Sequence, residues 1–512
     1  MINAHEMQLI VSSRRTQVGV LLVPALRHML FAVITISATI ATVAGQPDRD
    51  VVIILCDDFN PFCTGFAGDP DVKTPHLDAL AQQSAVFSRC YATSTVCMPS
   101  RTSLITGLYP HSTGCWGNAQ ELFVAPELTT LFSDLKRAGF ATTVIGKTHW
   151  FAGTGFKNRF ESKKEYFRDI GIDVYHDIVT TFGSRGGSGV YQDYLRKMGL
   201  FERQSADLTD RLANNQYVAR PSLLAPEQTG DWMMADIAVD HLHRTPASQS
   251  IAMLVAFSNP HSPFDPPGRY ATMYLPENVS LRPNVKTFKK YGTDYSLAEL
   301  RQARAAYLGK ITYLDDLTGR IIEALKKRGR WDNTIVVFTA DHGLAVGEHG
   351  NIAKGQFWEE VARIPMVVRI PGLTDAGIET DALAQLIDIY PTLLHAVSGE
   401  VSRHVQGRSL LPAIDGRGAE VRQSVFCEIH HDESLDYMVR DQRYKWFTQR
   451  GEESLYDLKN DPLEQSNLVH SSEHVGTVKD LRDQLRRFLM TQQVNHSAGY
   501  TPLVERVKNA KE

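Results

Sequence analysis

The chain contains little cysteine, six residues in 512. Disulfide-dense scaffolds carry far more, so that class of protein is excluded, although one or two bridges would fit the count. No Cys-x-x-Cys pair occurs, which argues against a structural zinc site. The sequence shows no internal repeat and no low-complexity tract, so repeat architectures are excluded as well.

The chain also carries little excess charge of either sign. The formal net charge is −4, and no run of lysine and arginine stands out. We therefore expect no nucleic-acid partner. Hydrophobic residues make up 43% of the chain and charged residues 22%, which is ordinary for a globular protein with a large core.

A long uninterrupted apolar run is missing, but a short one lies near the N-terminus. Arg27 and His28 precede an apolar stretch over residues 29–40, and small residues follow up to Gly45. This order of charged, apolar and small residues is typical of an export signal, so residues 1–45 are predicted to be a signal peptide or an N-terminal anchor. We expect an exported protein, periplasmic or secreted, with membrane anchoring by this segment as the alternative.

Short apolar runs alternate with helical patterns over most of the remaining chain. Five of them have the length of buried strands: 51–55, 142–145, 251–257, 334–339 and 366–370. Continuous apolar strands separated by helices predict an α/β fold, with a mostly parallel central sheet flanked by helices. One of these helices is predicted over 303–328, where apolar residues recur at helical spacing.

The pattern changes after about residue 400. Short strand-like pieces and one helical segment predict a smaller α+β subdomain, with a small antiparallel sheet and a terminal helix. We therefore expect a main α/β domain over 46–400 and a C-terminal subdomain over 401–512.

Chemically active side chains follow four of the predicted strands. They are Asp57 and Asp58, Lys147 and His149, His261, and Asp341 and His342. Because ligands of open parallel sheets bind beyond the carboxyl ends of the strands, these residues are expected at one edge. Three clustered aspartates would repel one another without a cation, and oxygen ligands suit Ca²⁺ or Mg²⁺ better than zinc.

The most specific motif is CMPSRTSLITG at residues 97–107. Pro99 fits the first turn of a helix, because its φ is helical and its missing N–H would have no partner there. Cys97 is therefore predicted at a helix N-terminus, where free N–H groups favour an anion. Arg101 follows about one turn later, and its guanidinium can fork onto the oxygens of an oxyanion.

This motif resembles the signature of type I, formylglycine-dependent sulfatases of the alkaline phosphatase superfamily. Other segments extend the resemblance over about residues 50–470, among them GKTH at 146–149, DIYPTLL at 388–394 and GRSL at 407–410. The chain is similar to iduronate sulfatase-like and choline sulfatase-like members, and the resemblance implies an alkaline phosphatase-like fold. It also implies that a formylglycine-generating enzyme oxidises Cys97 to an aldehyde during maturation.

The resemblance further implies the roles of the site residues. A divalent cation, Ca²⁺ in preference to Mg²⁺, would be held by Asp57, Asp58, Asp341, His342 and the group formed from Cys97. Six residues would act on the sulfate ester. Cys97 supplies the nucleophile, Arg101, Lys147 and Lys354 neutralise sulfate oxygens, His261 protonates the leaving alkoxide, and His149 removes the proton that lets sulfate leave.

The implied activity is hydrolysis of a sulfate monoester to an alcohol and inorganic sulfate. A sulfated carbohydrate or a sulfated small molecule is the expected substrate. Two alternatives stay open at this point. One is a phosphate or phosphonate monoester hydrolase of the same superfamily, and the other is a non-catalytic anion-binding protein in which Cys97 stays a thiol. The sequence predicts no oligomeric state.

Overall fold

A computed structural model describes residues 48–118, 124–125, 127–150, 162–178, 180–187, 189–400, 404–416, 420–431 and 434–491. The predicted signal peptide or anchor, residues 1–45, lies outside the described residues. Residues 46–512 form one compact unit by themselves, and the boundary predicted near residue 400 stays a prediction. In the part of the chain that is described, no helix is both long and apolar enough to span a bilayer.

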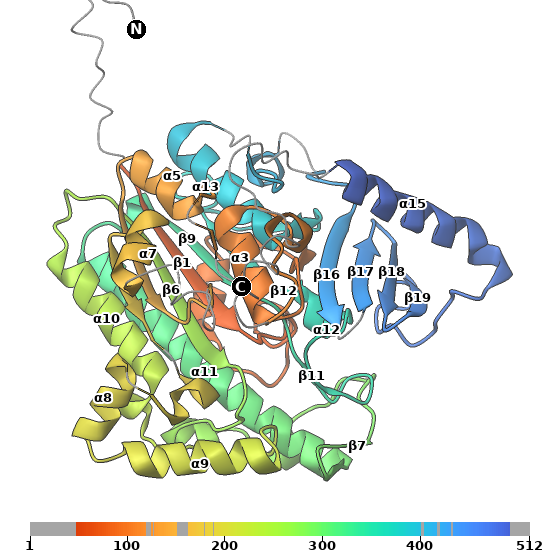
Figure 1. The fold of residues 1–512 in the computed structure, drawn as a ribbon, viewed down its shortest axis with the longest axis horizontal. Helices are drawn as coiled ribbons and strands as arrows, with labels where there is room; N and C mark the ends of the chain where they lie inside the picture. The colour runs from red at the N-terminus through yellow and green to blue at the C-terminus, as the bar shows by residue number, and fades with distance from the viewer. Residues whose placement is uncertain are drawn as a thin grey trace, which may run out of the picture. The chain divides into compact units, whose positions relative to one another are not determined.

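An eight-stranded sheet forms the centre of this unit, in the order β14-β2-β13-β9-β1-β6-β4-β5 (Figure 1). Five neighbouring strands are parallel: β9 (Thr334–Ala340), β1 (Asp50–Asp57), β6 (Ile251–Pro260), β4 (Ala141–Gly146) and β5 (Val174–Asp177). The other three are β13 (Met366–Arg369), which is antiparallel to its neighbours, β2 (Ala85–Phe87) and β14 (Ile378–Thr380). The predicted α/β fold with a mostly parallel sheet is confirmed.

The apolar runs form the central strands because helices cover the sheet. Every residue of β1 and β6 is buried, which explains why their sequences are continuously apolar instead of alternating. One group of helices is α2 (Pro75–Ala81), α10 (Gly230–Arg244) and α11 (Leu297–Lys327), and the other is α3 (Cys97–Thr106), α5 (Leu131–Arg137) and α13 (Ile389–Ser398). The two groups lie on opposite faces of the sheet (Figure 1).

Helix α11 starts earlier than the predicted residue 303. The Ser296 side chain caps the helix by accepting hydrogen bonds from the N–H groups of Ala298 and Glu299. A serine in this position satisfies N–H groups that have no partner within the helix. The prediction relied on the apolar spacing from residue 303 onward and missed residues 297–302 and their serine cap.

Before residue 420, the remaining α-helices and strands of the described residues lie around these layers. They are β3 (Cys90–Tyr91), α4 (Pro110–Thr113), α7 (Lys163–Asp169), α8 (Val190–Lys197), α9 (Phe201–Asn214), β7 (Phe288–Lys290), β8 (Thr293–Tyr295), β10 (Ala345–Val346), β11 (Ile352–Ala353), α12 (Glu359–Ala362), β12 (Arg363–Ile364), β15 (Ala384–Gln385) and α14 (Leu411–Ile414). All six cysteines are buried and unpaired, so the bridges that the cysteine count allowed are not formed.

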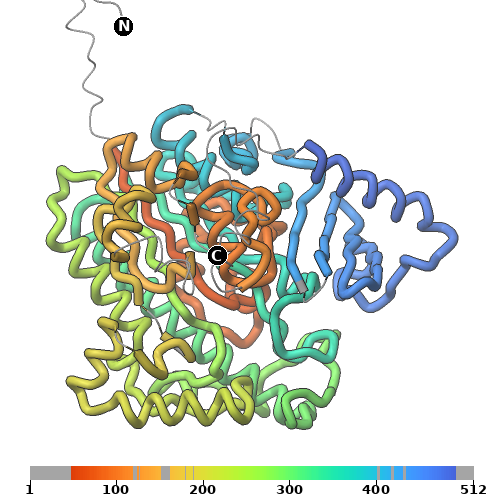
Figure 2. The backbone as a smooth tube through the Cα atoms, in the orientation of Figure 1, coloured from red at the N-terminus to blue at the C-terminus, as the bar shows by residue number. Residues whose placement is uncertain are grey.

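A four-stranded antiparallel sheet follows toward the C-terminus. Its strands are β16 (Val425–His431), β17 (Ser434–Arg440), β18 (Tyr444–Gln449) and β19 (Glu452–Asp457), and α15 (Val475–Thr491) packs on it. Figure 2 shows this part of the chain as the blue segment beside the main sheet. The predicted antiparallel sheet and terminal helix are therefore present.

Helix α11 approaches the backbone at Tyr270 so closely that a methyl group added at Gly309 should lower the stability of the protein. A Cβ on Gly309 would lie 2.3 Å from the carbonyl oxygen of Tyr270, whereas a Cβ on Gly476 in α15 would meet no atom within 4 Å. Alanine is favoured over glycine inside a helix by up to about 1 kcal/mol. We expect Gly309→Ala to lower the melting temperature in calorimetry because the clash outweighs this gain.

The matched variant Gly476→Ala is expected to leave the melting temperature unchanged or to raise it slightly. Equal shifts for the two variants would contradict the close approach at Gly309.

Candidate active site

The carboxyl ends of four parallel strands bring the predicted residues to one edge of the sheet. Asp57 ends β1 and Asp58 follows it, and Asp341 follows β9. The N–H of Asp341 donates to the carbonyl oxygen of Cys56 at 3.1 Å, and this hydrogen bond fixes the ends of β1 and β9 against each other. Asp58 has a left-handed φ of 61°, a conformation that aspartate tolerates better than most residues.

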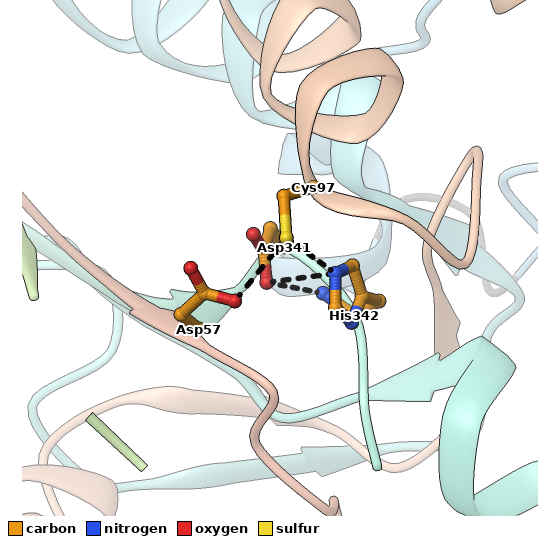
Figure 3. Close-up of side chains that lie close together, drawn as sticks. All are labelled: Asp57, Cys97, Asp341 and His342. Atoms are coloured by element: carbon orange, nitrogen blue, oxygen red, sulfur yellow. Dashed lines mark hydrogen bonds and ion pairs between the residues drawn. The ribbon is translucent and has the colours of Figure 1, made fainter. Parts of the chain in front are cut away.

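Cys97 is the first residue of α3, with Val96 as the N-cap and Pro99 in the first turn, as predicted. The thiol is buried and points at the sheet edge. Its Sγ lies 3.5 Å from Asp57 Oδ1 and 3.3 Å from His342 Nε2. Figure 3 shows the thiol of Cys97 directed between Asp57, Asp341 and His342, which come from two neighbouring strand ends.

Two lysines approach the same sulfur atom. Lys354 Nζ lies 3.0 Å from Cys97 Sγ and 2.9 Å from Asp58 Oδ1. Lys147 Nζ lies 3.8 Å from the sulfur and also pairs with Asp57. Burial and Asp57 raise the pKa of the Cys97 thiol, but Lys147 and Lys354 outweigh them and hold it well below its usual value. The site therefore favours an anion at the position of the sulfur.

Arg101 is fully buried and organises the carboxylates. Its Nε donates to Asp341 Oδ2 at 2.7 Å, its Nη2 donates to Asp57 Oδ2 at 3.2 Å, and its Nη1 donates to the carbonyl oxygen of Lys147. Although burial lowers the pKa of the guanidinium, these aspartates raise it above its usual value. Three of its five N–H groups are thereby engaged, and the predicted contact of Arg101 with a sulfate oxygen stays a prediction.

The acidic residues fit a divalent cation. Asp57, Cys97, Asp341 and His342 each offer one ligand atom, and these atoms all lie within 4.8 Å of one another. The fifth predicted ligand, Asp58, has a buried Oδ2 without a hydrogen-bond partner. A buried carboxylate oxygen left in this way is costly unless a cation satisfies it.

The two histidines differ in their positions. His261 Nδ1 lies 2.6 Å from the carbonyl oxygen of Ser262, so Nδ1 carries the proton and Nε2 faces the cluster, 3.7 Å from Asp58 Oδ2. Burial, followed by the charge of Lys354, lowers the pKa of His261 to about 4. His149 has a left-handed φ of 52°, and its buried Nδ1 has no hydrogen-bond partner. No hydrogen bond or ion pair between described residues joins it to the cluster, so its proton-transfer role stays a prediction.

Two further residues hold the turn that carries His261. Asp231 of α10 accepts a hydrogen bond from the Ser258 N–H at 2.7 Å. Lys310 of α11 donates to the carbonyl oxygens of His261 at 2.5 Å and Pro263 at 2.6 Å. Sequence reasoning missed both residues, because a single charged residue within a helix belongs to no motif. The buried position of Lys310 in an otherwise apolar helical face was the only signal that the sequence offered.

Comparison with known proteins identifies the family. The model of the Sulfatase family matches residues 49–399, and the model described as "N-sulphoglucosamine sulphohydrolase, C-terminal" matches residues 347–491. An arylsulfatase of Clostridium perfringens is 30% identical over 478 residues, which cover 88% of this chain and 96% of the relative. An N-acetylglucosamine-6-O-sulfatase of Bacteroides thetaiotaomicron is 24% identical, and 85% of each chain is covered.

Among solved structures, a phosphonate monoester hydrolase of Agrobacterium radiobacter has a TM-score of 0.73 at 23% identity, with 89% of this chain and 98% of that chain covered. This likeness concerns the fold. The family match over most of the chain and the arylsulfatase relative show more: the chain belongs to the sulfatase family. Its activity is that of a sulfuric ester hydrolase, and the predicted resemblance is confirmed.

The contacts of Lys310 predict a positioning role. We expect Lys310→Met to lower kcat for an aryl sulfate by about tenfold, because two carbonyl groups lose a charged donor and the His261 turn becomes less fixed. KM should change little, since Lys310 has no contact with the Cys97 cluster among the described residues. Steady-state kinetics measure the split between kcat and KM.

Lys310→Arg is the matched control, because it keeps a buried donor at this position. Partial recovery of kcat is expected. A rise in KM at constant kcat for Lys310→Met would contradict the positioning role.

Proposed function

We propose that the protein hydrolyses sulfate esters of carbohydrates, using a formylglycine formed at Cys97 and a bound Ca²⁺. The observation that carries this proposal is the surroundings of the Cys97 sulfur atom. It lies at the start of a helix, within 4 Å of Lys147, Lys354, His342 and Asp57. Such a position stabilises negative charge on whatever atom replaces the sulfur.

The six cysteines differ in a way that sets the surroundings of Cys97 apart. Burial raises the pKa of each of the other five thiols, Cys56, Cys63, Cys90, Cys115 and Cys427. Cys97 alone has its pKa lowered well below the usual value, because two lysines outweigh the effect of burial. The neighbours of Cys97 stabilise a negatively charged reacting group at this position, whereas the other five cysteines serve as small apolar side chains.

The proposed roles of the residues follow from their positions. A formylglycine supplies a hydrated aldehyde, one hydroxyl of which is the nucleophile toward sulfur. Lys147 and Lys354 lie where they can neutralise the charge of the sulfate oxygens through the transition state, and Arg101 keeps the aspartates in place. His261 presents Nε2 to the cluster. Its pKa of about 4 leaves Nε2 without a proton in the free protein. The negative charge of the bound sulfate ester would raise this pKa, so that Nε2 takes up the proton that it then gives to the leaving alkoxide.

The cation would be held by Asp57, Asp58, Asp341 and His342. Its positive charge would neutralise both the sulfate oxygens and these carboxylates. Three carboxylates and few other donors favour a hard cation. We propose Ca²⁺ over Mg²⁺, because Ca²⁺ accepts irregular coordination while Mg²⁺ demands an octahedron.

Two observations support a carbohydrate substrate. The Bacteroides thetaiotaomicron relative is named for a sulfated amino sugar, and it matches this chain over 85% of its length. The C-terminal family model, over residues 347–491, is also named for a sulfated amino sugar. We further propose that the protein is exported and that a formylglycine-generating enzyme acts on it during maturation.

Turnover of two aryl esters tests the proposed reaction against phosphate ester hydrolysis. We expect kcat/KM for 4-nitrophenyl sulfate to exceed that for 4-nitrophenyl phosphate, because the site has to balance only one negative charge on a sulfate monoester. The ratio should be at least about tenfold, or 1.4 kcal/mol of transition-state stabilisation. A preference for the phosphate ester would favour the phosphomonoesterase or phosphonate hydrolase alternative.

Cys97→Ala is the control for this measurement, and we expect it to abolish turnover of both esters. Mass spectrometry of the peptide that contains Cys97 should show an aldehyde in protein from a host with the modifying enzyme. A wholly unmodified, inactive thiol in such protein would sink the formylglycine proposal, and retained anion binding would then favour the non-catalytic alternative.

Removal of the cation gives an independent test of the ligand set. After dialysis against a chelator, we expect aryl sulfate hydrolysis to fall by at least about a hundredfold and Ca²⁺ to restore it better than Mg²⁺. Asp58→Asn should weaken Ca²⁺ binding in calorimetry by about tenfold or more, since a neutral amide replaces the carboxylate. Unchanged Ca²⁺ affinity in this variant would exclude Asp58 as a ligand.

A further inference from the structure

The β7–β8 hairpin is tied to the loop that carries Lys354. Before its first strand, the Lys286 N–H donates to the carbonyl oxygen of Gly347 at 3.1 Å. At its tip, Lys290 Nζ donates to Asn351 Oδ1 at 2.6 Å. Asn351 precedes Lys354 by three residues in the chain, so the tip of the hairpin lies beside one wall of the Cys97 site.

The same tip is tied to the turn that carries His261. The ring of Tyr291 stacks on that of Tyr217, with centroids 5.9 Å apart and planes at 27°. Tyr217 follows Gln216, whose Oε1 accepts a hydrogen bond from Ser262 Oγ at 3.3 Å. Ser262 is the neighbour of His261, so the hairpin spans from the lysine side of the site to the histidine side.

Tyr217 connects the tip to the cluster itself. After burial, the negative charge of Asp58 is the next largest cause that raises the pKa of Tyr217, and Lys354 lowers it. The phenol therefore lies within electrostatic range of both residues, and Tyr291 stacks on this ring from the solvent side, 52% exposed.

A second cation, Arg450, lies on the turn that contacts the loop carrying Lys354. Burial, and after it the charge of Arg450, lowers the pKa of Lys290. Arg450 is exposed and follows Gln449, whose Nε2 donates to the carbonyl oxygen of Gly355, directly after Lys354. The β18–β19 turn thus supplies a positive charge to the same rim.

The two cations have no carboxylate partner in the described residues. Lys290 donates to the neutral Asn351, and the nearby Asp294 pairs with Lys289 at 3.9 Å. The buried Asp436 accepts from the backbone N–H of Arg450. Lys290 Nζ also lies over the Tyr291 ring, 5.0 Å from its centroid. Positive charges without a carboxylate partner beside a half-exposed aromatic ring attract an anionic ligand that also has an apolar face.

We propose that Lys290, Tyr291 and Arg450 form a subsite for an anionic sugar unit, next to the unit whose sulfate ester reacts at Cys97. The subsite rests on the proposed function of the Cys97 site. The sugar ring packs against the exposed part of Tyr291, and its sulfate or carboxylate group accepts hydrogen bonds from Lys290 and Arg450. A small aryl sulfate leaves the subsite empty, so the subsite selects anionic oligosaccharides without contributing to the reaction of small esters.

Competition separates this subsite from the Cys97 site. The probe is a heparin-derived tetrasaccharide, measured as an inhibitor of 4-nitrophenyl sulfate hydrolysis. We expect the double variant Lys290→Gln/Arg450→Gln to raise its inhibition constant by about tenfold or more, which corresponds to the loss of two charged hydrogen bonds. Tyr291→Ala should raise it about threefold through lost ring contact. In all these variants, kcat and KM for the aryl sulfate should stay within about twofold of the parent values.

Lys289→Gln is the matched control, because it removes one charge from the same hairpin at a side chain that is 79% exposed. It should leave the inhibition constant unchanged. An equal effect of Lys289→Gln and Lys290→Gln, or no effect of the double variant, would overturn the subsite.

Failure of the subsite and failure of the proposed function give different results. If the parent protein releases sulfate from neither the aryl sulfate nor the tetrasaccharide, the proposed function fails, and calorimetric titration with the tetrasaccharide replaces the competition assay. Loss of tetrasaccharide affinity in the double variant then still supports the subsite, and absence of binding to the parent protein overturns it.

Discussion

Charge balance at one edge of the sheet is the constraint on which the rest of the site depends. Asp57, Asp58 and Asp341 are all buried there, and isolated carboxylates in such a place would be neutralised or excluded. The fully buried guanidinium of Arg101 binds two of them, and Lys354 binds the third. The cost of burying these charges is offset only while every partner stays in place.

Because the buried charges have to stay paired, the residues around the Cys97 cluster are polar and are held in fixed positions. Helix α3 has to start at Cys97 so that the sulfur meets Lys354 and His342, while Arg101 reaches back to the aspartates one turn later. Behind the His261 turn, two buried side chains, Asp231 of α10 and Lys310 of α11, each hydrogen-bond to the backbone and hold it in place. The side chains near the reacting atom are therefore oriented by backbone contacts that lie outside the site.

The parallel core was predictable because continuous apolar runs form strands only where helices cover both faces of a sheet. The order of the strands was not, because β13 lies antiparallel between β9 and β2, and pairing direction leaves no mark on a short apolar sequence. Lys354 could be named only through a resemblance, since it follows the two-residue strand β11 instead of a core strand. Asp231 and the hairpin tip at Lys290 had no local signal, and Lys310 had only its place in an otherwise apolar helical face, because their contacts join segments far apart in the chain.

The sequence by itself determined the class of fold, the strand ends that carry carboxylates and the start of a helix at Cys97. These features depend on local periodicity and on residue types with fixed conformational preferences, such as Pro99. Only the tertiary structure decided which charges neutralise each other, that Arg101 binds Asp57 and Asp341, and that Lys290 contacts Asn351 in the loop of Lys354. Pairing of charges depends on distances across the fold, and distances are set when the strands and helices pack.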